Sequence, residues 1–195
     1  MTTSTVCEII WFAGLVVWCI IRYPFERKAK KVRVTKSLFG RRELGLLAFA
    51  FVGLCIIPAT YALIGFPKSL DRPVIPPIAG LGVVTLCAAL WLFYRSHVDL
   101  GRNWSISLEI RKEHRLVTTG VYRFIRHPMY SSFFLLALAQ VLLVPNWLAG
   151  ASGLLGVGVL YAFRVQQEER MMLEGFGTDY RSYMAHTKRL IPWIL

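Results

Sequence analysis

The sequence has few acidic residues and no cysteine pattern typical of a disulfide framework or a metal site. Only 11 Asp and Glu residues oppose 23 Lys and Arg residues, which gives a formal net charge of +12. The cysteines form no C-x-x-C pair and all lie in apolar stretches. We therefore predict no bound metal and expect these side chains to be small buried hydrophobes. They are Cys7, Cys19, Cys55 and Cys87.

Charged residues are nearly absent from several long hydrophobic runs. Hydrophobic residues make up 55% of the 195 residues, and the mean hydropathy is +0.50, which is too apolar for an ordinary soluble domain of this length. The basic residues cluster between the apolar stretches, as they do in cytoplasmic loops of membrane proteins. The positive charge is therefore interpreted as a signal of membrane orientation, and no nucleic-acid partner is expected.

Apolar stretches at residues 6–21, 44–66, 74–94, 129–144 and 147–163 are predicted to cross the lipid bilayer as helices. No basic residue precedes the first stretch, so it differs from a signal peptide. Only Pro145 and Asn146 separate the last two stretches, which predicts a tight hairpin. Small residues four apart in its second helix favour close helix contact in lipid. They are Ala149 with Gly153, and Ser152 with Gly156.

The predicted fold is all-α: a polytopic integral membrane protein with five transmembrane helices, its N-terminus outside and its C-terminus cytoplasmic. In that orientation every long basic segment lies on the cytoplasmic side. Residues 1–195 form a single membrane-embedded domain, with three N-terminal spans in 1–94 and the polar segment and hairpin in 95–195. Residues 104–110 alternate polar and apolar side chains, which fits an edge strand or an interfacial segment equally well.

A polar, basic and aromatic segment runs from His114 to Tyr130 and leads directly into the hairpin. His127 followed by Pro128 is a helix-start signal. The backbone N–H groups of Met129, Tyr130 and Ser131 would then lack intrahelical partners, at the positive end of a helix dipole. This helix start is therefore a candidate seat for an anionic group.

Arg164 and Glu168 stand four residues apart where the last span would leave the membrane, so they share a helix face. Spacing alone is compatible with a simple ion pair or with a site. Hairpin geometry brings the start of one helix next to the end of the other, so both residues should be neighbours of Met129 and Tyr130.

Other chemically suggestive residues have plainer interpretations when taken singly. His97 and Asp99 have the spacing of two metal ligands, but with no third ligand nearby we expect solvated loop residues. Tyr122 and Tyr130 could be aromatic residues of the membrane interface.

The order of the motifs resembles the isoprenylcysteine carboxyl methyltransferase family. Residues 115–130 read R-L-V-T-T-G-V-Y-R-F-I-R-H-P-M-Y, and after the apolar hairpin come R-x-x-x-E-E and F-G-x-x-Y-x-x-Y. The pattern is also similar to a wider set of membrane methyltransferases that includes phospholipid N-methyltransferases. The resemblance covers residues 100–192.

This resemblance implies an S-adenosyl-L-methionine-dependent methyltransferase whose product is S-adenosyl-L-homocysteine. Its acceptor would be a lipophilic, prenylated or lipid-like carboxylate, methylated on the cytoplasmic side of the membrane. Arg164 would bind that acceptor carboxylate. The resemblance places these residues at the cofactor: His114, Arg115, Leu116, Val117, Tyr122, His127, Pro128, Met129, Tyr130 and Glu168.

Two alternatives remain open from the sequence. A phospholipid N-methyltransferase would act on an amine, which must lose a proton and favours acidic or aromatic surroundings over an arginine. A non-catalytic membrane scaffold would bind no cofactor and would leave the polar segment without a purpose.

Overall fold

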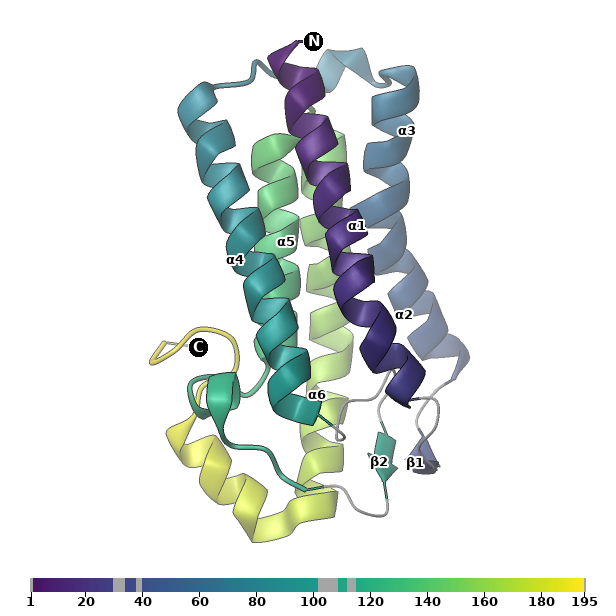
Figure 1. The fold of residues 1–195 in the computed structure, drawn as a ribbon. Coiled ribbons are helices and arrows are strands. Elements are labelled where there is room, and N and C mark those ends of the chain that lie inside the picture. Colours follow the sequence, from purple (N-terminus) through teal and green to yellow (C-terminus); the bar gives the residue numbers. More distant parts are fainter. Residues whose placement is uncertain (1, 30–33, 38–39, 102–108, 112–114, 195) are drawn as a thin grey trace.

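The computed structural model describes residues 2–29, 34–37, 40–101, 109–111 and 115–194. Long helices run side by side as a bundle, and a shorter helical segment turns away at one end (Figure 1). The α-helices are α1 (Thr3–Ala29), α2 (Arg41–Phe51), α3 (Ile57–Ile64), α4 (Pro76–Leu100), α5 (Pro128–Leu143) and α6 (Trp147–His186). The described residues also contain the π-helix η1 (Val52–Ile56) and the 3₁₀ turns η2 (Lys68–Leu70) and η4 (Gly120–Arg123).

Four helical segments of the described residues are long and apolar enough to cross a membrane: Thr3–Ala29, Arg41–Ile64, Pro76–Leu100 and Trp147–His186. Their outer faces carry large apolar side chains such as Leu63, which is 84% exposed. The molecule is thus a multi-pass membrane protein. Helix α5 is a shorter apolar helix of 16 residues, and the predictions of a fifth span and of the orientation stay predictions.

Helix α5 packs against both α4 and α6, and α1 packs mainly against α4. The core between these helices contains the fully buried Trp11 of α1 together with Leu86, Ala139 and Leu143. The start of α5 therefore lies beside the end of α4 and beside α6. In the predicted orientation this is the cytoplasmic end of the bundle. This packing positions the polar segment that precedes α5.

The contact between α6 and the Arg41–Ile64 segment depends on glycine. A Cβ atom on Gly53 would lie 2.4 Å from the backbone oxygen of Ser152, so only glycine permits this approach. The Gly53 carbonyl, in η1, accepts hydrogen bonds from the Ser152 hydroxyl at 2.7 Å and the Gln140 amide at 3.0 Å. Gly153 and Gly156 also face this segment closely, which confirms the predicted role of the small residues.

The predicted helical fold class is confirmed, and the described residues add to it one short antiparallel strand pair, β1 (Val34–Ser37) with β2 (Glu109–Arg111). Ile110 of the alternating segment is thus in a strand, while residues 104–108 lie outside the described residues.

The prediction that the cysteines are buried is wrong for Cys19 and Cys87, which are exposed on the outside of the bundle. Lipid tails are as apolar as a core, so a small apolar side chain in a spanning helix has no need to face inward.

Candidate functional site

The polar segment, the end of α4 and the C-terminal part of α6 meet at one end of the bundle (Figure 1). Helix α6 runs past its apolar part, which ends at Phe163, and bends at Gly177, where φ is +53°. Glycine adopts this φ without the steric cost that a Cβ atom imposes. The bend turns the chain back, so that residues after His186 reach the start of α5.

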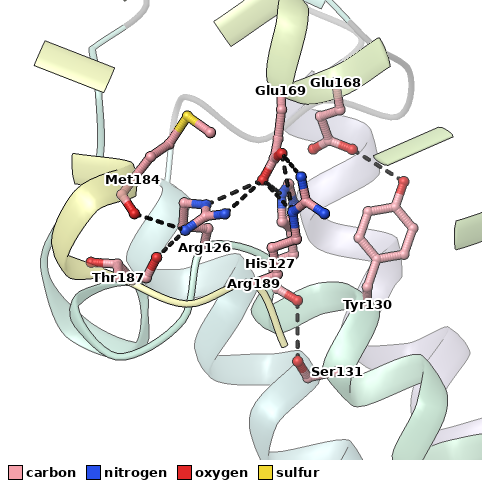
Figure 2. A network of polar contacts seen from close by, with 9 residues as sticks. All are labelled: Arg126, His127, Tyr130, Ser131, Glu168, Glu169, Met184, Thr187 and Arg189. Atoms are coloured by element: carbon pink, nitrogen blue, oxygen red, sulfur yellow. Dashed lines mark hydrogen bonds and ion pairs between the residues drawn. The ribbon is translucent and has the colours of Figure 1, made fainter. Parts of the chain in front are cut away.

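Glu169 is the buried centre of a cluster of charged side chains at this end (Figure 2). One of its carboxylate oxygens accepts from Arg126 at 3.0 Å and from His127 Nε2 at 3.2 Å, and the other from Arg189 at 2.6 Å. The side chains of Glu169 and Arg126 are only 6% and 8% exposed. A buried carboxylate needs such partners, because burial without them is costly.

The C-terminal segment is fixed to the polar segment by backbone pairing as well. The Arg126 N–H donates to the carbonyl of Lys188 at 2.7 Å, and the His127 N–H to that of Arg189 at 3.0 Å. The Arg126 guanidinium also donates to the carbonyls of Met184 and Thr187 (Figure 2). Arg126 therefore joins the polar segment, α6 and the C-terminal segment.

Burial opposes the ionisation of Glu169, but hydrogen bonds from His127, Arg189 and Arg126 together outweigh it and hold the pKa of this carboxyl well below its usual 4.5. Because the pKa of Glu169 is lower in the folded than in the unfolded state, the ionised carboxylate stabilises the fold above pH 4.5. That contribution is lost as the pH falls through the folded-state pKa. We expect the melting temperature in detergent to fall between about pH 5 and about pH 3, and to fall less steeply in Glu169→Gln. Equal slopes for the two proteins would contradict this assignment.

Tyr130 and Glu168 form a second polar pair beside this cluster. The Tyr130 hydroxyl donates to Glu168 Oε2 at 3.1 Å (Figure 2). The predicted neighbourhood of the start of α5 and residue 168 is therefore confirmed. Tyr130 is 5% exposed and stacks edge-on against His127 and Tyr161, so it packs inside the protein and is not an aromatic residue of the membrane interface.

Tyr122 is buried as well, and its hydroxyl donates to the carbonyl of Ser96 at 3.4 Å. Burial, followed by the charge of Glu168, raises the pKa of Tyr122, so this side chain stays a neutral phenol. An interfacial position is therefore wrong for Tyr122 too, because η4 folds under the end of α4.

Arg164 pairs with a residue from another helix. Its guanidinium nitrogen Nη2 lies 3.2 Å from Glu43 Oε1, and the two side chains are 14% and 8% exposed. The simple ion pair between Arg164 and Glu168 is not found among the described residues. The Nε atom of Arg164 is buried and has no hydrogen-bond partner there.

The helix start itself has fewer open donors than predicted. The Ser131 N–H donates to the His127 carbonyl at 3.1 Å, so Ser131 is already within the first helical turn. Among the described residues, none accepts a hydrogen bond from the backbone N–H of Met129 or Tyr130. The two donors at the start of α5 are available to an anionic group.

The turn before α5 depends on Asp99. Its carboxylate accepts from the Val121 N–H at 2.8 Å and from Arg95 at 2.8 Å. Gly120 has φ +62°, and a Cβ atom there would lie 2.1 Å from Asp99 Oδ2. The prediction of solvated loop residues is wrong: His97 and Asp99 end helix α4, and His97 is fully buried. No group of metal-binding side chains occurs in the described part of the chain.

The other predicted residues are spread along the polar segment. His114 lies outside the described residues, while Arg115, Leu116 and Val117 lie in a stretch without regular secondary structure. Pro128 is fully buried and Met129 half-buried at the start of α5. Their assignment to a cofactor stays a proposal.

Sequence reasoning missed Glu169 and Glu43. Two consecutive helical residues point in different directions, so Glu169 has a different set of partners from Glu168. The adjacent acidic pair was the available signal for Glu169. Glu43 stands alone after a basic loop, and nothing in its spacing indicated Arg164 as its partner.

Residues 81–174 match the profile described as the Isoprenylcysteine carboxyl methyltransferase (ICMT) family. A protein-S-isoprenylcysteine O-methyltransferase of Schizosaccharomyces pombe is 31% identical over 111 residues, which cover 56% of this chain and 47% of that protein. Protein-S-isoprenylcysteine O-methyltransferase B of Arabidopsis thaliana is 27% identical over 119 residues, 60% of each chain. The matched region thus spans about half the length of these curated relatives.

A solved structure, that of the eukaryotic intramembrane Ras methyltransferase ICMT, shares the fold with a TM-score of 0.54. The alignment has 22% sequence identity and covers 80% of this chain and 55% of that one. Sequence and fold together confirm the predicted resemblance of this chain to the isoprenylcysteine carboxyl methyltransferase family, with residues 81–174 as the matching region.

Proposed function

We propose that the protein transfers a methyl group from S-adenosyl-L-methionine to the carboxylate of a lipophilic, isoprenylcysteine-like acceptor. The observation that carries this proposal is the arrangement of Tyr130, Glu168 and Arg164 around the start of α5. The family match and the names of the relatives support the same reaction class.

The charges of the site fit the proposed cofactor. Glu168 is a half-buried carboxylate that can pair with the cofactor ammonium. The open N–H donors of Met129 and Tyr130 suit its carboxylate. Aromatic faces such as those of Tyr130 and Tyr122 suit its sulfonium and adenine. When bound, this cofactor would supply an activated methyl group.

The acceptor would be held by Arg164. The buried Nε of this guanidinium has no partner among the described residues, which leaves a donor for a carboxylate. An acceptor carboxylate is already a nucleophile at neutral pH, so its oxygen forms the new C–O bond as the methyl–sulfur bond breaks. No proton is transferred, and the chain needs no general base. Its residues orient the acceptor and exclude water.

We propose that this chemistry takes place on the cytoplasmic side, where the predicted orientation places the site. Apolar outer faces of the helices would let a lipid tail approach from the bilayer. The bilayer and the lipophilic acceptor are thus the proposed partners. The polar cluster at the end of the apolar helices supports this proposal, because an acceptor with a charged head and a lipid tail would need both surroundings.

Purified protein with methyl-labelled cofactor and an N-acylated S-farnesylcysteine should yield base-labile label, as expected for an ester. Glu168→Gln should weaken S-adenosyl-L-homocysteine binding about tenfold, because a charge-assisted contact is lost. Glu174→Gln, an exposed residue of the same helix, is the matched control. Calorimetric titration measures both.

Base-stable label on a phospholipid amine would instead indicate N-methylation. A folded, monodisperse protein that binds neither the cofactor nor its product would contradict the proposal and favour a scaffold.

A further inference from the structure

Arg164 and Glu168 lie on one face of α6, one turn apart, and each is drawn to a different helix. Arg164 Nη2 is 3.2 Å from Glu43 of α2, and Glu168 Oε2 is 3.1 Å from the Tyr130 hydroxyl of α5. Opposite charges at this spacing normally attract each other. Glu43 and Tyr130 therefore replace the Arg164–Glu168 ion pair that the spacing within α6 favours.

The partner of Arg164 is itself well buried. The Glu43 side chain is 8% exposed and that of Arg164 is 14% exposed, so little water screens their interaction. Removing one member of such a pair leaves the other as an uncompensated charge in a poorly solvated place. Without the Glu43 carboxylate, the nearest acidic partner for Arg164 on its own helix is Glu168.

An arginine engaged with Glu168 would conflict with both proposed ligands. It would neutralise the carboxylate that is to pair with the cofactor ammonium, and it would turn guanidinium donors away from the acceptor. The buried Nε of Arg164 has no hydrogen-bond partner among the described residues. In its present position Arg164 therefore has an N–H donor that a ligand could use.

We propose that Glu43 is a positioning residue that holds Arg164 apart from Glu168, so that each of the two can bind its own ligand. This inference rests on the proposed function. Glu43 lies outside residues 81–174, the region that matches the family profile, so α2 adds a residue to the site that this match does not include.

Calorimetric binding of S-adenosyl-L-homocysteine to the detergent-purified full chain tests the proposal. Glu43→Gln keeps the shape but removes the charge, and it should weaken binding about tenfold because Arg164 then occupies Glu168. The double variant Glu43→Gln with Arg164→Gln should recover the wild-type affinity to within about threefold, because no arginine remains to compete. If the substitutions simply damaged the fold, the double variant would instead bind more weakly than Glu43→Gln.

Glu43→Asp retains the charge and should retain most of the affinity, which separates charge from packing. Asp179→Asn, an exposed residue of α6, is the control and should bind like the wild type. Melting temperatures identify any variant that does not fold, and if Glu43→Gln alone does not fold, the double variant then carries the comparison.

Unchanged binding by Glu43→Gln, or no recovery in the double variant, would overturn the role of Glu43 while the wild-type titration still supports a cofactor site. Absence of binding by the folded wild type would overturn the proposed function and this inference with it. Binding without methylation of the farnesylcysteine probe would overturn only the proposed acceptor.

Discussion

Glu169→Gln is expected to lower the stability of the folded protein by about 3–5 kcal/mol, the usual cost of breaking a buried ion pair. Glutamine fills the same space but cannot neutralise Arg126, whose side chain is 8% exposed. Arg189 would lose its carboxylate as well. Thermal unfolding in detergent should show a large fall in melting temperature at neutral pH, and protease should cleave the C-terminal segment more readily.

The matched control for this variant is Glu174→Gln, which changes an exposed carboxylate on the same helix. Its melting temperature should stay close to that of the wild type, because exposed charges contribute little. If Glu169→Gln unfolded at the same temperature as the control, the cluster around Glu169 would not be a source of stability.

Gly53→Ala is expected to destabilise the bundle by about 3 kcal/mol, at the upper end of what overpacking costs. The new methyl group would lie 2.4 Å from the carbonyl oxygen of Ser152, and a backbone atom cannot rotate away. The segment Arg41–Ile64 and α6 would have to separate. The hydrogen bonds from Ser152 and Gln140 to the Gly53 carbonyl would then lengthen.

Gly45→Ala provides the comparison on the same segment, since a Cβ atom at Gly45 meets nothing within 4 Å. Alanine is the better helix former, so this variant should be unchanged or slightly more stable. Melting temperature and the yield of monodisperse protein measure both variants. Similar behaviour of the two would show that the helices do not approach closely at Gly53.

Hydropathy predicted four of the spanning segments but not where their helices end, and the fifth span stays a prediction. The apolar stretch 147–163 continues as α6 to His186, and the stretch 6–21 lies within a helix that ends at Ala29. The length of an apolar stretch corresponds to the part of a helix that crosses the hydrocarbon core of the bilayer. The hydrogen bonds within the helix can continue beyond the membrane into water, so the helix can be longer than its apolar stretch. The bend at Gly177 leaves no hydropathy signal at all.

The spacing of residues in the sequence predicted only part of the candidate site. A tight hairpin fixes which helix ends meet, so Tyr130 and Glu168 could be placed together from the sequence. The partner of Arg164 comes from α2, and those of Glu169 come from the polar segment and from the C-terminal segment. Sequence periodicity shows which residues share a face of one helix. It does not show which side chain from a distant segment packs against that face.

The pairing of the chain from Lys188 to Leu190 with the start of α5 bears on how this protein can be handled in the laboratory. The family match ends at residue 174, so trimming the chain to the matched region would remove Arg189 and its backbone contacts. A purification tag or fluorescent fusion would disturb this polar end of the bundle least at the N-terminus, which lies at the opposite end (Figure 1).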